Sequence, residues 1–199
     1  MATDVVQSQT DCIRERLIQA ADEELAEYGS LTGRFEAVAH RAGVSRATAY
    51  RQMRSVSELL TQVGLRRARK YLAGLQEVID GETGAMNKLE ASLIYGAQAL
   101  PGDPIVLNLI ARQFTSGRDP DVYELVNELV RPTVAAGQRR GEIRDDIDID
   151  AVIDYIVEQS YFATHGHDRS ARAVSQRFRL FIEPAIAPRA ALGPHVGTD

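Results

Sequence analysis

Apolar residues recur at every third or fourth position along nearly the whole chain. Near the start, Ile13, Leu17, Ala21 and Leu25 follow this spacing, and Gly29 then ends the pattern. No stretch alternates between apolar and polar residues for long enough to form a convincing strand. The pattern therefore predicts an all-α protein with about nine helices.

Glycine and capping residues divide the first part of the chain into short helices. A helix from about 33 to 40 ends at Gly43, and Ser45 can cap the next helix by accepting a hydrogen bond from a free backbone N–H. A longer helix then opens with a capping box of Ser55 and Glu58. Two short helices around a tight turn are typical of a helix-turn-helix, in which the second helix presents its side chains to the major groove of DNA.

Two acid–proline pairs divide the rest of the chain. Asp103-Pro104 and Asp119-Pro120 each place a capping residue before a proline at the first helical position. Together with the apolar spacing they predict a helical bundle, with helices at about 83–100, 104–115, 120–140, 150–165 and 170–184. We expect a flexible N-terminus over residues 1–9 and a disordered tail over residues 186–199.

The composition is that of a soluble globular protein. Of the 199 residues, 44% are hydrophobic and 26% are charged, a balance that disordered chains do not have. No apolar run approaches the roughly 20 residues of a membrane-spanning helix, and the first residues lack the basic and apolar segments of a secretory signal. The single cysteine excludes an internal disulfide and a zinc site made of several cysteines. We therefore expect a cytoplasmic protein with no membrane partner.

The net charge does not indicate a nucleic-acid partner, but the distribution of charge does. The 23 basic and 28 acidic residues give a net charge of −5. Between Glu36 and Glu58 there is no acid. The arginines in this interval are Arg41, Arg46, Arg51 and Arg54. Because phosphate attraction acts within a Debye length of about 8–10 Å, a local basic cluster suffices for DNA binding.

The first 60 residues carry a characteristic set of motifs. They are Ala20-Ala21, Leu25, Tyr28-Gly29, Thr32, Val38-Ala39, the string AGVSRATAY from Ala42 to Tyr50, Ser55 and Leu59-Leu60. This set resembles the tetracycline-repressor (TetR) family of transcription regulators. The resemblance implies a homodimer with a helix-turn-helix DNA-binding domain over 10–54 and an effector-binding and dimerisation domain over 55–185. We accordingly expect a repressor that leaves a two-fold operator when a small molecule binds.

Three positions depart from the family pattern. Met53 replaces the usual phenylalanine, Gln52 stands where histidine or tyrosine is common, and Val56 stands where lysine is usual. The absence of that lysine removes an expected phosphate contact, for which Arg54 can compensate.

Position along the predicted second helix of the motif, together with the resemblance, assigns the DNA contacts. They are Thr32, Ser45, Arg46, Ala47, Thr48, Tyr50, Arg51 and Gln52. Arg46 and Arg51 can bind guanine in a bidentate manner or pair with phosphates, and Ala47 can touch a thymine methyl group. Tyr50 and Thr48 are expected to bind phosphates, as is Thr32 at the start of a helix. The alternative is that the arginines form only a solvated face.

The helix expected at 104–115 is apolar nearly all round, so we expect it to be internal. Polar and aromatic residues on and beside it could then line a small-molecule pocket. They are Tyr95, Asn108, Phe114, Tyr123 and Asn127. Ordinary core packing with buried water is the alternative for these residues. For the whole domain, the alternative is a DNA-binding protein whose C-terminal part only mediates protein association, without an effector.

The last two predicted helices carry more apolar surface than one chain needs. Their apolar faces are expected to form a four-helix interface between two subunits. The interface residues would be Val152, Tyr155, Ile156, Phe162, Val174, Phe178 and Phe181. A monomer with a larger core is the alternative.

The sequence offers no catalytic group, cofactor motif or metal site. His165, His167 and Asp168 stand beside a glycine at a predicted helix end, where histidines more often interact with the C-terminal dipole than with a metal. No serine, histidine and acid are arranged around a nucleophile turn. We therefore expect no enzymatic activity, no cofactor and no bound metal.

Overall fold

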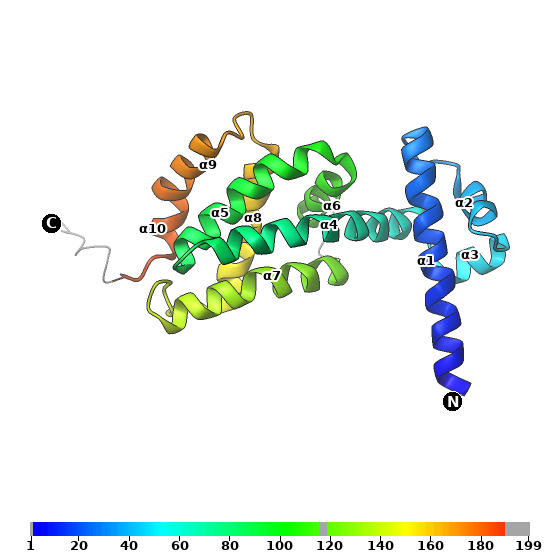
Figure 1. Cartoon of the computed structure of the whole chain (residues 1–199), viewed down its shortest axis with the longest axis horizontal. Helices are drawn as coiled ribbons and strands as arrows, with labels where there is room; N and C mark the ends of the chain where they lie inside the picture. The colour runs from blue at the N-terminus through cyan, green and yellow to red at the C-terminus, as the bar shows by residue number, and fades with distance from the viewer. Residues whose placement is uncertain (1, 116–118, 190–199) are drawn as a thin grey trace. The chain divides into compact units, whose positions relative to one another are not determined.

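The computed structural model describes the backbone of residues 2–115 and 119–189, with the side chains of these residues except 2–9, 113–115 and 126. Every regular element of this described part is helical (Figure 1), which confirms the predicted all-α class. The α-helices are α1 (Ala2–Tyr28), α2 (Phe35–Arg41), α3 (Arg46–Gln52), α4 (Val56–Gly81), α5 (Ala85–Ala99), α6 (Pro104–Thr115), α7 (Pro120–Arg139), α8 (Ile149–His165), α9 (Ala171–Arg177) and α10 (Glu183–Ile186). A 3₁₀ turn, η1 (Leu100–Gly102), precedes α6, and a π-helical segment, η2 (Phe178–Ile182), joins α9 to α10. Of the described helices, none combines the length and the apolar character that crossing a membrane requires.

The chain divides into two compact units. The N-terminal unit spans residues 1–68 and the C-terminal unit spans residues 69–199. The helix α4 contributes to both, because the division falls inside it. The domain boundary expected from the sequence, between residues 54 and 55, lies before α4.

In the N-terminal unit, α2 and α3 pack against α1 and against each other. The helix α1 begins at Ala2, so it includes residues 2–9 of the expected flexible N-terminus. The flexibility of this segment stays a prediction. The helix α2 begins at Phe35, later than expected, because Gly33 has a φ of +70°, which an α-helix does not use. Gly43, with a φ of +66°, makes the tight turn before α3. The predicted helix-turn-helix is therefore present.

Side-chain caps begin the helices where the sequence predicts them. The Ser45 Oγ accepts a hydrogen bond from the backbone N–H of Thr48 at 3.1 Å, at the start of α3. In the predicted capping box, the Ser55 Oγ accepts from the N–H of Glu58 at 3.1 Å. The Glu58 carboxylate in turn accepts from the N–H of Arg54 at 2.8 Å. The helices α6 and α7 begin at the two predicted prolines.

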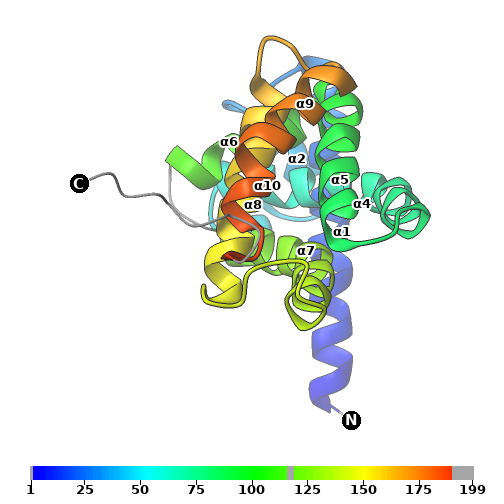
Figure 2. The same cartoon turned by 90° about the vertical axis from the view of Figure 1, so that its left-hand side faces the viewer.

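The C-terminal unit is a helical bundle in which α5 contacts α7, α8 and α9 (Figure 2). Its buried core consists of Ala85, Leu89, Leu93, Ala97, Val134, Ile143, Val152, Ile153, Ile156, Ala163, Val174, Phe178, Ile182 and Ile186. The helix α7 approaches α5 closely at Gly137. A Cβ added there would lie 2.7 Å from the Ala85 Cβ and 2.7 Å from the Ile143 Cδ1. Glycine at this position therefore permits the close approach.

The last helical run differs from the prediction in its interior and at its end. The single helix expected over 170–184 consists of α9, η2 and α10. Pro184 lies in the first turn of α10, where its missing N–H is tolerated. Ile186 is 3% exposed and belongs to the core, so the predicted disordered tail does not begin at this residue. Residues 190–199 of that tail lie outside the described residues.

Candidate nucleic-acid interface and effector-binding residues

Two arginines of α1 hold the helix-turn-helix by its backbone. The Arg16 Nη2 donates to the carbonyl oxygen of Ala42 and, at 3.2 Å, to that of Gly43, in the turn between α2 and α3. The Arg14 Nη1 donates to the carbonyl oxygen of Gln52 at 3.3 Å, at the end of α3. These bonds satisfy carbonyl groups that a helix leaves free at its C-terminal end. Sequence reasoning missed both arginines.

A buried carboxylate fixes α2 to α1. Glu24 is 2% exposed and forms ion pairs with the Arg34 Nε at 2.6 Å and with the Arg41 Nη2 at 2.7 Å. Arg41 also pairs with Glu27 at 2.6 Å, and the hydrogen bond to Glu27 raises the pKa of Arg41 above its usual value. Arg41, which the sequence counts in the basic cluster, is therefore already balanced by carboxylates within its own unit.

The helix α3 presents its predicted outward face to solvent. Ala49 and Met53 are fully buried, as expected from their spacing. The exposed residues on the other side are Arg46, Ala47, Tyr50 and Arg51. α3 thus carries two exposed arginines and one exposed tyrosine on one side.

Two contacts organise that exposed face. The Tyr50 ring stacks on the Phe35 ring of α2 with 4.3 Å between centroids. The Arg46 guanidinium lies 5.5 Å from the Tyr50 ring centroid and forms an ion pair with Glu36 of α2. The stacked rings are fixed between α2 and α3, and Arg46 lies beside them. In contrast, the Arg51 Nη2 donates a long bond, 3.4 Å, to the Thr48 hydroxyl group of its own helix.

The remaining predicted DNA contacts lie at or near the ends of the motif. The Ser45 and Thr48 hydroxyl oxygens are 3.0 Å apart at the start of α3. The Gln52 side chain is half-buried at the end of α3. Thr32 is exposed, but it lies in the turn before α2, where its N–H donates to the Ser30 Oγ at 3.1 Å. The prediction that Thr32 begins a helix is therefore wrong.

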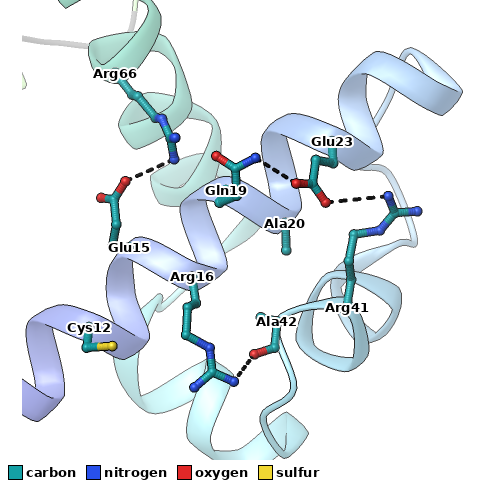
Figure 3. A pocket seen from close by; sticks show the side chains of 9 residues that line it. All are labelled: Cys12, Glu15, Arg16, Gln19, Ala20, Glu23, Arg41, Ala42 and Arg66. Atoms are coloured by element: carbon teal, nitrogen blue, oxygen red, sulfur yellow. Dashed lines mark hydrogen bonds and ion pairs between the residues drawn. The ribbon is translucent and has the colours of Figure 1, made fainter.

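A groove on the N-terminal unit has a volume of about 450 Å³ (Figure 3). It is lined by Cys12, Glu15, Arg16, Gln19, Ala20, Glu23, Arg41, Ala42 and Arg66. Its charged side chains are largely engaged with one another: Glu15 pairs with the Arg66 Nη1 at 2.9 Å, and Glu23 with the Arg41 Nη1 at 3.7 Å. The groove is therefore a junction between helices with internally matched charges.

The predicted effector-binding residues do not share one environment. The Tyr95 hydroxyl donates to the Tyr71 carbonyl oxygen at 3.2 Å and lies 2.5 Å from where a Cβ on Gly74 would be. It therefore packs α5 against the C-terminal half of α4. The Asn127 Oδ1 accepts from the Arg131 Nε at 3.3 Å, within α7. Both side chains are half-buried and already have partners.

The helix α6 is less enclosed than the sequence predicts. Its described buried side chains are Val106 and Leu109, whereas Asn108 is exposed. The prediction that α6 is internal is therefore wrong, because one face of the helix, which includes Asn108, meets solvent. The assignment of Asn108 to an effector site stays a prediction. Tyr123 on α7 is half-buried, and the side chain of Phe114 lies outside the described residues.

A cleft of about 210 Å³ lies in the C-terminal unit, and it is not lined by Tyr95, Asn108, Tyr123 or Asn127, the predicted effector-binding residues whose side chains are described. Its lining is Gln76, Ile79, Asp80, Lys88, Glu128, Leu129, Pro132, Thr133, Ala136 and Arg140. The volume is below the roughly 300–1,000 Å³ that is usual for a small-molecule site.

The predicted subunit interface divides into core and surface residues. Four of its members, Val152, Ile156, Val174 and Phe178, are 1–4% exposed and lie in the core of this chain. The sequence assigned them to a partner subunit, but they have almost no accessible surface with which to touch one. Tyr155 is half-buried, and its hydroxyl donates to the Phe181 carbonyl oxygen at 3.3 Å. The exposed members are Phe162 and Phe181.

A third large apolar side chain of the last helices is exposed, and sequence reasoning missed it. Leu180 is 58% exposed, beside Phe181 at 67%, and Phe162 on α8 is 59% exposed. The signal available in the sequence was the apolar run Leu180-Phe181-Ile182, in which not all the side chains can face one core. We call these three residues, Phe162, Leu180 and Phe181, the exposed apolar residues.

Metal-binding clusters are absent from the part of the chain that the structure describes: no three His, Cys, Asp or Glu side chains there are grouped to hold an ion.

Several solved structures share this arrangement, in which a helix-turn-helix unit is followed along the chain by a helical bundle. RolR in complex with resorcinol is 15% identical, with 94% of this chain and 93% of that chain covered and a TM-score of 0.67. A TetR-family regulator from Marinobacter aquaeolei VT8 is 14% identical, with 91% and 98% covered and a TM-score of 0.53. FadR from Bacillus subtilis in complex with stearoyl-CoA is 18% identical, with 82% and 96% covered and a TM-score of 0.52.

These similarities identify the fold as that of the TetR-family transcription regulators. The identities are low, so they carry the fold and not the ligand or the operator. No family model and no curated protein matches the chain.

Proposed function

We propose that the chain is a transcription repressor without enzymatic activity, which binds a two-fold DNA operator as a homodimer in the cytoplasm and is released by a small-molecule effector. The observation that carries this proposal is the exposed face of α3. It presents Arg46, Arg51 and Tyr50 to solvent, on a helix whose C-terminal end is held by Arg14 of α1. Guanidinium groups on a fixed helix can bind phosphates and the major-groove edge of guanine.

The dimer is supported by two arguments. One short recognition helix contacts too few bases for useful specificity, so two copies reading adjacent half-sites are expected. Three large apolar side chains, Phe162, Leu180 and Phe181, are each more than half exposed to water. A second copy of the chain would cover them if these surfaces met across a two-fold axis.

The effector is supported by the fold class and by the location of aromatic and amide side chains in the C-terminal unit. RolR and FadR have the same fold and were solved with resorcinol and with stearoyl-CoA, respectively. We propose that Tyr123 and Asn127 of α7, which are half-buried, contribute to an effector site in this unit. For release from DNA, the effector has to favour one of two dimer conformations by about 1–3 kcal/mol.

DNA binding is tested by incubating the purified protein with a library of random 30-base-pair duplexes at about 50 mM salt and sequencing the retained fraction. The expected result is enrichment of a palindromic sequence with two half-sites. Arg51→Ala should weaken binding to the selected duplex by roughly 5- to 150-fold if Arg51 reads a base. A protein that retains no duplex at this salt concentration would refute the function.

The effector is tested by thermal shift with a panel of small apolar and aromatic compounds, followed by anisotropy with the selected duplex. A compound that raises the melting temperature and lowers DNA affinity supports an effector-released repressor. A broad panel without a responder favours the second candidate, a constitutive DNA-binding protein whose C-terminal unit serves association alone. The engaged Tyr95 hydroxyl and the exposed Asn108 are the observations in favour of that candidate.

A further inference from the structure

Arg46 differs from the other arginines of the helix-turn-helix in the partner that it has. Its guanidinium forms an ion pair and a hydrogen bond with the Glu36 carboxylate. Arg46 is the first residue of α3, and Glu36 lies in the first turn of α2. The two side chains are 63% and 66% exposed. This pair therefore lies on the surface and links the two helices of the motif.

The neighbouring arginines are arranged differently. Arg34 and Arg41 bind the buried carboxylate of Glu24, which is 2% exposed, so these pairs belong to the interior packing. Arg51 lies on the same exposed face of α3 as Arg46 and has no carboxylate partner among the described residues, only the 3.4 Å bond to Thr48. Of the two exposed arginines of α3, Arg46 thus has a carboxylate partner among the described residues and Arg51 does not.

We infer that Glu36 competes with DNA for Arg46 and thereby lowers the affinity of the helix-turn-helix for DNA. The inference rests on the proposed DNA-binding function. Before Arg46 can bind a phosphate or a base, it must leave Glu36, whose carboxylate then remains on the surface that approaches the anionic duplex. An exposed ion pair of this kind corresponds to about a 1.5- to 5-fold change in an equilibrium constant. Binding of Arg46 to any DNA sequence therefore requires the loss of the Arg46–Glu36 ion pair.

A suitable base recovers the cost. A bidentate contact between an arginine and guanine discriminates between bases by about 5- to 150-fold, which exceeds the loss of the surface pair. Because the Arg46–Glu36 pair is lost whether Arg46 binds a base or a phosphate, Glu36 lowers the affinity for the operator and for unrelated sequences alike. The ratio between the two affinities therefore stays about the same.

The rest of the face stays fixed during this exchange. Tyr50 remains stacked on Phe35 across the two helices, with 4.3 Å between ring centroids. Only the Arg46 side chain needs to rotate, from Glu36 toward the major groove of the DNA. The exchange is therefore a local event that requires no rearrangement of α2 or α3.

The test compares Glu36→Gln with Glu15→Gln in the full-length protein. Glu15 is a matched control, because its side chain is 65% exposed, it pairs with an arginine of the same unit, and the substitution changes the net charge equally. Affinities for a scrambled 30-base-pair duplex and for the operator selected by the wild-type protein are measured by fluorescence anisotropy between 50 and 200 mM salt. Circular dichroism confirms that both variants are helical, and Glu36→Ala provides a second removal of the carboxylate.

The inference predicts that Glu36→Gln binds the scrambled duplex about 1.5- to 5-fold more tightly per subunit. The slope of log affinity against log salt should steepen by about 0.9 per subunit. The affinity for the operator should rise by about the same factor as that for the scrambled duplex, because both complexes lose the Arg46–Glu36 pair. Glu15→Gln should change neither the affinities nor the slope. Equal effects of the two variants would overturn the inference, because net charge alone would then explain them.

A double-mutant cycle separates competition from simple repulsion. In the Arg46→Ala background, Glu36→Gln should change the affinity for the scrambled duplex by less than about 1.5-fold. A full effect in this background would overturn the inference, because Glu36 would then act on phosphates directly. A wild-type protein that binds neither duplex would instead refute the proposed function, and this result is obtained before any variant is made.

Discussion

Replacing Gly137 with alanine tests how tightly α7 packs on α5. The new Cβ would lie 2.7 Å from the Ala85 Cβ and 2.7 Å from the Ile143 Cδ1, whereas carbon atoms in contact normally stay about 3.5–4 Å apart. The Ala85 Cβ is attached to the backbone of α5, and Ile143 is 1% exposed, so neither can move away freely. Such overpacking costs about 1–3 kcal/mol. The better helix propensity of alanine offsets about 1 kcal/mol of that cost.

The two rigid contacts place the cost in the upper part of the range, so Gly137→Ala should lose about 1–2 kcal/mol of stability. For a chain of this size that corresponds to a melting temperature lower by about 2–8 °C, measured by circular dichroism. Gly96→Ala is the control, because its Cβ would have the ordinary contact distance of 3.9 Å to Leu100 and to Thr164. It should stabilise the helix by up to about 1 kcal/mol. A Gly137→Ala protein as stable as the wild type would refute the packing argument.

Two further measurements test the polar contacts, and a third tests the exposed apolar residues. Glu24→Gln should destabilise the N-terminal unit by about 2 kcal/mol in urea unfolding, because two arginines lose a buried partner. Glu27→Gln, at the exposed end of the same network, is the control and should have a much smaller effect. The hydrogen bond from Arg144 lowers the pKa of Asp146 to about 2 from 3.8. The stability that ionised Asp146 contributes is fully present above pH 3.8 and is lost as the pH falls through about 2. Asp146→Asn should therefore make the melting temperature less dependent on pH between about 2 and 3.8. Phe181→Ser, at a residue 67% exposed, should shift the protein toward monomer in analytical ultracentrifugation without loss of helicity.

Helix boundaries were predictable from the sequence because the chemistry that sets them is local. Ser45 and Ser55 cap helices by bonding to an N–H three residues later, and a proline begins both α6 and α7. The outward face of α3 was predictable for the same reason, since Ala49 and Met53 lie four residues apart on its buried side.

Contacts between distant parts of the chain were not predictable in this way. Arg16 donates to a carbonyl group 26 residues away. Glu24 pairs with Arg41 of α2 and with Arg34, which precedes that helix. An arginine or glutamate on an amphipathic helix looks the same in the sequence whether it is solvated or buried in a pair. The contacts that position the candidate site were therefore missed, although its exposed residues were identified.

The apolar faces of the last helices show a second limit. Spacing indicates that a face is apolar, but it does not say whether the same chain or another molecule covers it. Val152 and Phe178 turned out to be covered by this chain, while Phe162 and Phe181 were not. Asn108 shows the converse, because its place in an apolar helix predicts an internal side chain, whereas the side chain is exposed.

The π-helical segment allows one short helical run to serve two surfaces. Phe178 and Ile182 face inward, at 1% and 5% exposed, while Leu180 and Phe181 between them face outward. An inserted residue advances the phase of the side chains that follow by about 100°. Shortening this segment by one residue would restore uniform winding, and the inward and outward sets would then lose their common register. The π-helical segment thus requires a particular number of residues, and not only a particular composition, for the inward and outward side chains to keep their positions.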